Sequence, residues 1–204
     1  MTAVWKSGFS TAALVGMAAL VGCGGSPPEP AETEPAPAEA AAPPEMLGGG
    51  ALTPVHDGQA GSPHVRVDWE IDGANISITY GRPYLRDRTV GDTVEPLEGS
   101  VWRLGADEAT TLATDTDLMV GAAHVPAGEY TLWTLTTGDS TELIVNAETG
   151  QWGTAYDPAH DLDRTEMTVG TLDAPAEQLT LFLENRELRF EWGSMVASVP
   201  ILVH

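Results

Sequence analysis

Residues 65–80 read VRVDWEIDGANISITY, and this stretch decides the fold. Every second side chain between 65 and 71 is apolar, so two valines, a tryptophan and an isoleucine share one face of an extended chain. The same alternation returns between 76 and 80. Asp72-Gly73 lies between the two runs and is typical of a type I′ turn, whose central residues both need positive φ. The stretch therefore predicts an antiparallel hairpin with one buried face.

Similar runs follow at intervals of about 8 to 12 residues, with turn residues between them. Asn185 marks the sharpest of the later turns, between two runs of alternating apolar residues. No window of 12 residues shows a helical apolar stripe. The pattern predicts an all-β fold, a single antiparallel β-sandwich of jelly-roll type with little helix. Further strands are expected within 130–135, 143–145, 179–183, 188–192 and 195–203.

The N-terminal end has the pattern of an export signal. Lys6 precedes an uncharged apolar run over 9–22, which is too short for an ordinary membrane-spanning helix and has the length of a signal-peptide core. The run ends in Leu20-Val21-Gly22-Cys23, which resembles the lipobox of bacterial lipoproteins. We predict a lipoprotein signal peptide over 1–22 and a lipidated Cys23. The alternative is a secreted protein with an incidental cysteine.

Residues 23–50 form a segment rich in Pro, Ala and Glu that contains five glutamates and no basic side chain. Such a segment has too little apolar surface to offset its ordering entropy, so we expect a disordered tether. The β-domain is then expected over 51–204. Gly24, in place of Asp, favours the outer membrane over the inner one by similarity to enterobacterial sorting rules. Both a periplasmic and a surface-facing domain fit this prediction.

Charge and cysteine content exclude several classes of function. The net charge is −21, and residues 51–204 hold 25 acidic side chains against eight arginines. A phosphate backbone would be repelled by most of this surface, so the protein is not expected to bind nucleic acid. A single cysteine excludes a disulfide framework and a cysteine-based zinc cluster.

Motifs of familiar catalytic sites are absent from the sequence, including G-x-S-x-G, the Walker loop, G-x-G-x-x-G, H-E-x-x-H and C-x-x-C. No two of its five histidines are spaced at i, i+2 or i, i+4. The acidic loops at 115–117 and 157–163 lack the calcium-loop spacing. We therefore predict no metal site and no cofactor, although histidines distant in sequence can meet in a sandwich.

Positive charge is concentrated in one short region. Four of the eight arginines of residues 51–204 fall within 82–103, near the expected ends of strands. Guanidinium groups bind carboxylates or phosphates, and aromatic faces stack on sugars, which indicates a site for a small anion or a carbohydrate. The alternative is an Arg–carboxylate network that pins a long loop to the sandwich and satisfies backbone carbonyls. The candidate ligand-binding residues are Arg82, Arg86, Arg88, Trp102, Arg103, Asp107 and Glu108.

The same region carries a family resemblance. The motifs YGRP at 80–83, VWR at 101–103 with GADEAT at 105–110, PAGEYTLW at 126–133 and QWG at 151–153 resemble the bacterial DUF2911 family of unknown function, over about residues 61–203. The resemblance implies a single β-domain of the cell envelope and no particular reaction. The chain departs from the family pattern in three places: Arg86-Asp87-Arg88 replaces K-G-R, Leu104 replaces Thr, and Asp107 replaces an Asn that could donate an amide hydrogen.

Together these features predict a lipid-anchored envelope protein with a non-catalytic module that binds a ligand or a protein. Its expected partners are the membrane, through the N-terminal lipid, and a small anionic or glycan ligand or another envelope protein. One alternative is a purely structural envelope lipoprotein. The other is a hydrolase or lyase in which Asp107 or Glu108 acts as the base and Arg82 or Arg103 stabilises developing negative charge.

Overall fold

The computed structural model describes residues 43–204. The expected signal peptide, Cys23 and the tether up to residue 42 lie outside the described residues. Within 43–204, no helix has the length and apolar character needed to cross a bilayer.

The regular secondary structure of the described chain is β-strand, apart from one short 3₁₀ turn. The strands of its first half are β1 (Met46–Leu47), β2 (Gly50–Asp57), β3 (Pro63–Ile71), β4 (Ala74–Gly81), β5 (Val101–Trp102) and β6 (Thr110–Thr114). The second half contains β7 (Leu118–Val120), β8 (Ala123–Val125), β9 (Gly128–Thr137), β10 (Ser140–Asn146), the 3₁₀ turn η1 (Pro158–His160), β11 (Asp161–Glu184) and β12 (Glu187–Val203).

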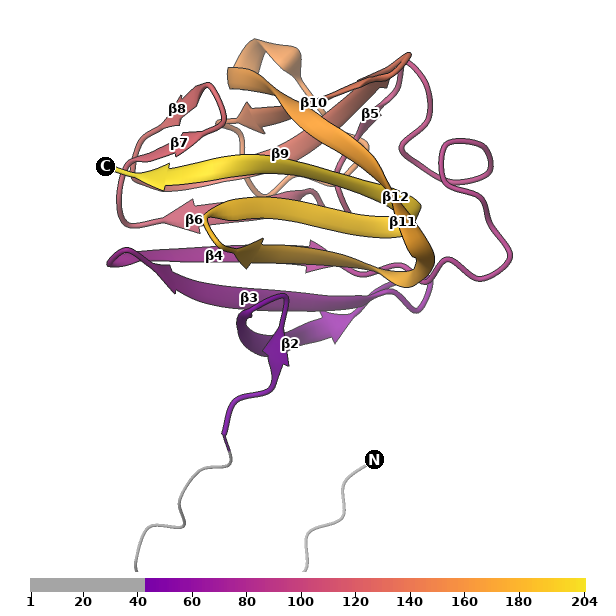
Figure 1. Cartoon of the computed structure of the whole chain (residues 1–204), viewed down its shortest axis with the longest axis horizontal. Coiled ribbons are helices and arrows are strands. Elements are labelled where there is room, and N and C mark those ends of the chain that lie inside the picture. Colours follow the sequence, from indigo (N-terminus) through magenta and orange to yellow (C-terminus); the bar gives the residue numbers. More distant parts are fainter. Residues whose placement is uncertain (1–42) are drawn as a thin grey trace, which may run out of the picture. The chain divides into compact units, whose positions relative to one another are not determined.

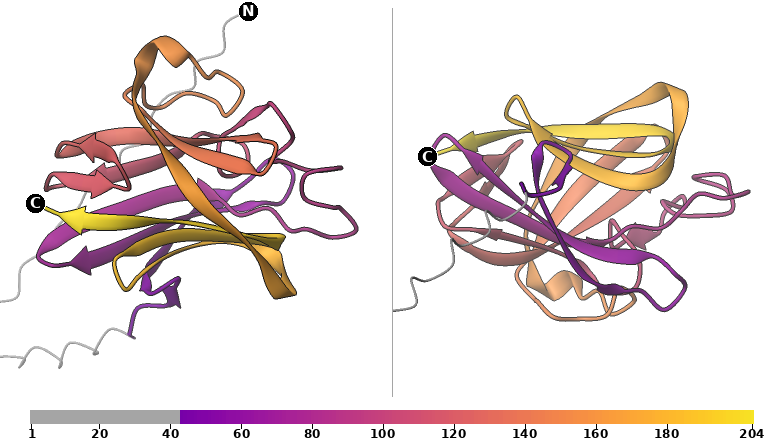
Figure 2. Two further views of the ribbon diagram at one scale, coloured as in Figure 1. Left: turned by 45° about the horizontal axis from the view of Figure 1, so that its top comes forward. Right: turned by 90° about the horizontal axis from the view of Figure 1, so that it is seen from below.

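The strands form one antiparallel sheet that folds over itself, in the order β1-β2-β3-β4-β6-β9-β10-β11-β12-β7-β8, with β5 beside β9 (Figure 1). The long strand β11 connects the two layers of the folded sheet, because it pairs with β10 and with β12. Its first part, Asp161–Met167, pairs with β10, and its later part, from Thr168 onward, pairs with β12, with register shifts on either side of Ala176. The later part and β12 therefore lie across the β3–β4–β6–β9 face (Figure 2). The prediction of an all-β, sandwich-like fold is confirmed.

The hairpin over 65–80 forms as expected. Ile71 pairs with Ala74, and the turn residues Asp72 and Gly73 have φ of 51° and 88°. The apolar face of β3 and β4 packs against the later part of β11 and against β12, so that both layers contribute to one core. Its largest fully buried members include Tyr80, Ile78, Leu181, Phe190 and Trp192.

Three features differ from the sequence analysis. Residues 188–203 form one strand and not two, because Gly193 adopts φ of 55° and carries the strand through a bend. The strand β11 begins at Asp161, well before the alternating run at 179–183. A short strand at Met46–Leu47 lies inside the expected tether, and the Trp69 indole donates to the Gly48 carbonyl at 2.9 Å.

Strands β5 and β6 share one edge of β9. Trp102 pairs with Thr134, and Thr110 pairs with Leu132 further along the same strand. The chain between them, 103–109, therefore leaves the sheet and returns to it within a few residues. We call this segment the 103–109 loop, and it contains three of the candidate ligand-binding residues.

Candidate functional site

The 103–109 loop is held in a fixed shape by hydrogen bonds to its own base and to its neighbours. The Trp102 indole donates to the Gly105 carbonyl at 3.1 Å, and the Thr110 hydroxyl donates to the Leu104 carbonyl at 3.0 Å. Leu104 and Asp107 have φ of 50° and 61°. Non-glycine residues rarely adopt positive φ, and such positions often occur where a side chain is aimed for function.

Beside this loop lies a cavity of about 430 Å³, which we call the arginine cavity. Of the seven residues expected to bind a ligand, five line it: Arg86, Arg88, Trp102, Arg103 and Asp107. Asp87 and Glu95 lie on its wall as well, so the cavity offers hydrogen-bond acceptors beside the guanidinium groups. The structure thus brings most of the expected set together in a space large enough for a small molecule.

The arginines of this region differ from all others between 51 and 204 in their partners. Each of the four arginines outside the 82–103 cluster forms an ion pair with an aspartate or glutamate, as Arg186 does with Asp72 at 2.7 Å. Within the described residues, Arg82, Arg86, Arg88 and Arg103 form none. The ion pairs of the network considered as an alternative for this region are therefore not formed within residues 43–204, despite the excess of acidic side chains. Its other part, the bonding of backbone carbonyls, is seen for Arg82 and Arg88.

Arg103 is the clearest member of this set. Its Nε is buried and has no hydrogen-bond partner within the described residues. Gly153 leaves room for its stem, since a Cβ at that position would come within 1.7 Å of the Arg103 Cδ. The stem is therefore packed against Gly153, and the buried Nε has no acceptor among residues 43–204. Leaving a buried charged donor unpaired costs free energy, which a bound anion would recover.

Arg82 and Arg88 have structural contacts. Arg82 donates from Nε to the Leu179 carbonyl at 3.1 Å and from Nη2 to the Thr180 hydroxyl at 2.9 Å. Arg88 donates to the Leu85 carbonyl at 3.1 Å and to the Tyr84 carbonyl. Arg82 thus joins the end of β4 to β11 and does not line the arginine cavity.

The aromatic side chains of Trp102 and Tyr84 both line the cavity but have different roles. Trp102 is 3% exposed, and its ring meets Phe190 edge-on at 5.8 Å between centroids, so it belongs to the core beneath the cavity. Tyr84 is 40% exposed and lines the cavity. Tyr84 is therefore the aromatic face that a ligand in the cavity could reach.

Asp107 and Glu108 meet at one histidine. Asp107 Oδ2 lies 3.4 Å and Glu108 Oε2 lies 3.1 Å from Nε2 of His64. Adjacent residues on a strand would point to opposite faces, but these two lie on a loop whose backbone turns at Asp107. Glu108 therefore faces away from the arginine cavity, toward a smaller cavity of about 210 Å³ that His56 also lines.

The pairing of His56 with His64 was not foreseen from the sequence. The two residues face each other across β2 and β3, and their rings stack at 4.3 Å between centroids with an interplanar angle of 16°. The sequence of residues 50–57 has no clear strand pattern, so the spacing of eight residues between the histidines did not indicate that they pair. The turn residues Asp57-Gly58 and Gly61 between them could have indicated a hairpin that places both histidines side by side.

Tyr80 forms part of the wall between the core and this smaller cavity. Burial raises the pKa of Tyr80, so the phenol stays neutral and its oxygen accepts a hydrogen bond from the Leu181 amide at 3.1 Å. This bond fixes the end of β4 against β11. Arg82 follows directly after this end of β4, and His64 on β3 pairs with Gly81 there.

Comparison with known proteins identifies the family. The family model described as "Protein of unknown function (DUF2911)" matches residues 62–201, which is more than half of the chain. The chain therefore belongs to the DUF2911 family, as its sequence motifs indicated. No curated protein and no solved structure matches it.

Proposed function

We propose that this member of the DUF2911 family is a cell-envelope lipoprotein whose β-domain is a non-catalytic binding module. Its ligand is a small anion that occupies the arginine cavity. The protein is attached to the outer membrane through a lipid on Cys23, and its β-domain lies in the periplasm or at the cell surface.

The observation that carries this proposal is the unpaired guanidinium of Arg103. In a chain with 30 acidic and nine basic side chains, an arginine without a carboxylate partner is unexpected. Arg86 lines the same cavity and likewise forms no ion pair within residues 43–204. A carboxylate or phosphate between these two side chains would accept hydrogen bonds in the forked geometry that guanidinium groups favour.

The other groups of the cavity narrow the class of ligand. Asp87 and Glu95 are acceptors suited to hydroxyl groups, and the exposed ring of Tyr84 offers a flat apolar face. A molecule that carries one anionic group, several hydroxyls and an apolar face fits these three features. A sugar acid is the simplest compound of this kind, so the proposed class is a hydroxylated organic anion.

A binding experiment with a matched pair of variants tests the ligand. The full chain is titrated calorimetrically with glucuronate, citrate and inorganic phosphate. We expect at least one to bind, with glucuronate the tightest, and Arg103→Ala to weaken that binding about tenfold or more. Arg186→Ala is the control, because Arg186 pairs with Asp72 at an exposed turn and should leave binding unchanged.

Two other results would redirect the proposal. Flat titrations with all three anions would remove the ligand and favour the purely structural lipoprotein. Slow conversion of a bound compound that disappears in both Asp107→Asn and Glu108→Gln would instead favour the hydrolase or lyase.

The proposed anchor rests on the sequence around Cys23 and has its own test. Cells that express the full chain are labelled with radioactive palmitate and fractionated. We expect label and protein together in the outer-membrane fraction, and neither label nor membrane association for Cys23→Ser. Wild-type protein that is exported without label would show a secreted protein with an incidental cysteine.

A further inference from the structure

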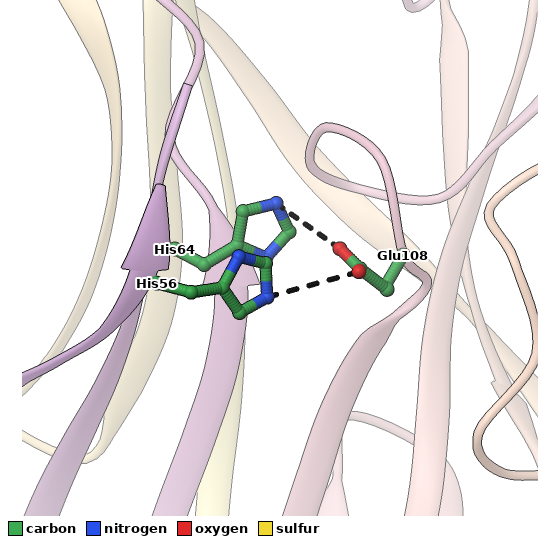
Figure 3. A group of neighbouring side chains, drawn as sticks. All are labelled: His56, His64 and Glu108. Carbon is green, nitrogen blue, oxygen red and sulfur yellow. Dashed lines mark ion pairs between the residues drawn. The ribbon is translucent and has the colours of Figure 1, made fainter. Parts of the chain in front are cut away.

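Two histidines and a glutamate converge at the edge of the smaller cavity. Figure 3 shows the rings of His56 and His64 side by side, with the Glu108 carboxylate facing both. His64 Nε2 lies 3.1 Å from Glu108 Oε2, and His56 Nε2 lies 3.7 Å from Glu108 Oε1. The ligand atoms of all three residues lie within 4.8 Å of one another. The His64 side chain is 3% exposed, whereas those of His56 and Glu108 are 46% and 43% exposed.

The hydrogen bonding of His56 determines which of its nitrogens is free. His56 Nδ1 lies 3.0 Å from the Asp57 carbonyl oxygen, which can only accept, so Nδ1 carries the hydrogen. In the neutral ring, Nε2 then presents a lone pair toward a carboxylate oxygen. Two lone pairs in this arrangement repel unless a positive charge lies between them. A backbone carbonyl that holds the second ring nitrogen in this way is also the usual outer-shell partner of a metal-binding histidine.

Two acceptor atoms that have no donor within residues 43–204 belong to residues that line the smaller cavity. Glu108 Oε2 is buried, and its contact with His64 does not have hydrogen-bond geometry, so it has no partner within the described residues. Gln151 lines the same cavity, and its Oε1 is a second buried acceptor without a partner. Asp107 Oδ2, in contrast, has donors: it accepts from the Gln59 amide at 3.0 Å and from His64 Nε2 at 3.4 Å. A metal ion on His64 Nε2 would replace that hydrogen, so its binding would release a proton. A cation would satisfy these two unpartnered acceptors, whereas an anion would add further acceptors to the cavity.

We propose that His56, His64 and Glu108 bind a divalent transition-metal ion, with zinc as the preferred metal. Two ligands of a tetrahedral zinc ion, each about 2.0–2.1 Å from it, lie roughly 3.3 Å apart, which is close to the separations between the histidine nitrogens and Glu108. Two imidazoles and one carboxylate match the ligand set of zinc and iron sites that keep an open position.

The nearly parallel rings require one adjustment. A metal binds in the plane of each imidazole, so rings at 16° must open before both can point at one ion. His56 is the ring that turns, because it lies at the exposed end of β2, whereas His64 is enclosed. The open coordination position then faces the cavity lined by Gln151. This site is separate from the arginine cavity, and the inference does not depend on a ligand there.

Zinc titration of the full chain tests the proposal. All proteins carry Cys23→Ser, which removes a competing thiol, and are first treated with a chelator. We expect calorimetry to show one zinc ion per chain, and Co²⁺ in place of zinc to give the visible absorption bands of a site with nitrogen ligands. His56→Ala and Glu108→Gln should each weaken zinc binding by more than about tenfold, the loss that even outer-shell changes can cause.

The matched control is His160→Ala. His160 lies 3.5 Å from Asp157 and 3.7 Å from Glu148, so it is a histidine with two carboxylates on an exposed surface. The His160→Ala variant should bind zinc as the parent does. Arg103→Ala should also bind zinc like the parent, which would show that the zinc site is independent of the arginine cavity. The proposal is overturned if the parent takes up no zinc, as a proton on His56 Nε2 would predict. It is also overturned if His56→Ala and Glu108→Gln, folded by circular dichroism, bind zinc like the parent.

Discussion

Two arginines of one short segment have opposite roles at the scale of single residues. Arg82 uses its donors on the Leu179 carbonyl and the Thr180 hydroxyl, and both bonds join β4 to β11. Arg103 has a buried Nε without a partner in the described chain. The sequence places them in the same cluster, because it shows the residue types and their spacing but not the acceptors that each side chain meets.

This difference predicts opposite effects on stability. Arg82→Ala should lower the free energy of unfolding by about 1–3 kcal/mol, because it leaves a buried carbonyl and a hydroxyl without their donor. Arg103→Ala should change it by less than about 1 kcal/mol, since it breaks no protein hydrogen bond and residues of binding sites often reduce stability. Urea unfolding of both variants measures the difference. A larger loss for Arg103→Ala than for Arg82→Ala would make Arg103 part of the scaffold.

At the scale of elements, the start of β11 is fixed by a polar triad. The Tyr156 hydroxyl donates to Asp161 at 2.8 Å, and Arg164 Nη2 donates to the Tyr156 oxygen at 2.9 Å and to Asp161 at 2.7 Å. The Tyr156 ring also lies 5.1 Å from the buried Trp133 ring. The triad therefore attaches the loop between β10 and β11 to the sheet at the point where β11 begins.

The triad gives stability a pH dependence on the alkaline side. Burial and then the hydrogen bond to Asp161 raise the pKa of Tyr156 from 10.0 to about 12. Because the pKa is higher in the folded state than in the unfolded state, the contribution of the Tyr156 hydroxyl to the free energy of unfolding is complete below pH 10 and is lost as the pH rises toward 12. The free energy of unfolding of Tyr156→Phe should be about 1 kcal/mol below that of the wild type at pH 8, and this deficit should shrink by pH 11.5.

Urea unfolding of both proteins at the two pH values measures this change. The raised pKa of the buried Tyr80 is common to both proteins and cancels in the comparison. A deficit that stays constant with pH would show that the Tyr156 hydroxyl does not stabilise the fold through its proton.

The elements that the sequence predicts well are those in which one face is buried. The hairpin over 65–80 and the pair on either side of Asn185 follow directly from alternation and turn residues. The strands β7 and β8 have three residues each, too few for an alternating pattern. The strand β11 is mostly exposed before Leu179, so its first half has no apolar periodicity and is formed by pairing with β10.

At the scale of the whole molecule, the fold brings distant segments together in ways that spacing cannot show. The smaller cavity combines residues of β2, β3, the 103–109 loop and the loop around Gln151. The sequence predicts Glu108 as a ligand-binding residue but places it with the arginines, because they are its neighbours along the chain. Only the pairing of β2 with β3 brings two histidines to Glu108, and residues 50–57 carry no alternating pattern that would predict β2.

The excess of negative charge is also a property of the whole molecule, and it predicts how stability responds to salt. Residues 51–204 carry 25 acidic side chains and eight arginines, so the folded surface repels itself. The screening length falls from about 30 Å at 0.01 M salt to 3 Å at 1 M, which weakens this repulsion while close ion pairs lose little.

The midpoint of thermal unfolding should therefore rise by about 2–6 °C between 0.01 and 1 M NaCl, as measured by calorimetry. Glu70, Asp92, Asp139 and Glu187 are exposed and form no ion pair within residues 43–204. Replacing all four by their amides should raise the midpoint at low salt and reduce its dependence on salt. A midpoint that falls with added salt would mean that attractive ion pairs, such as Arg186–Asp72, outweigh the repulsion of the unpaired carboxylates.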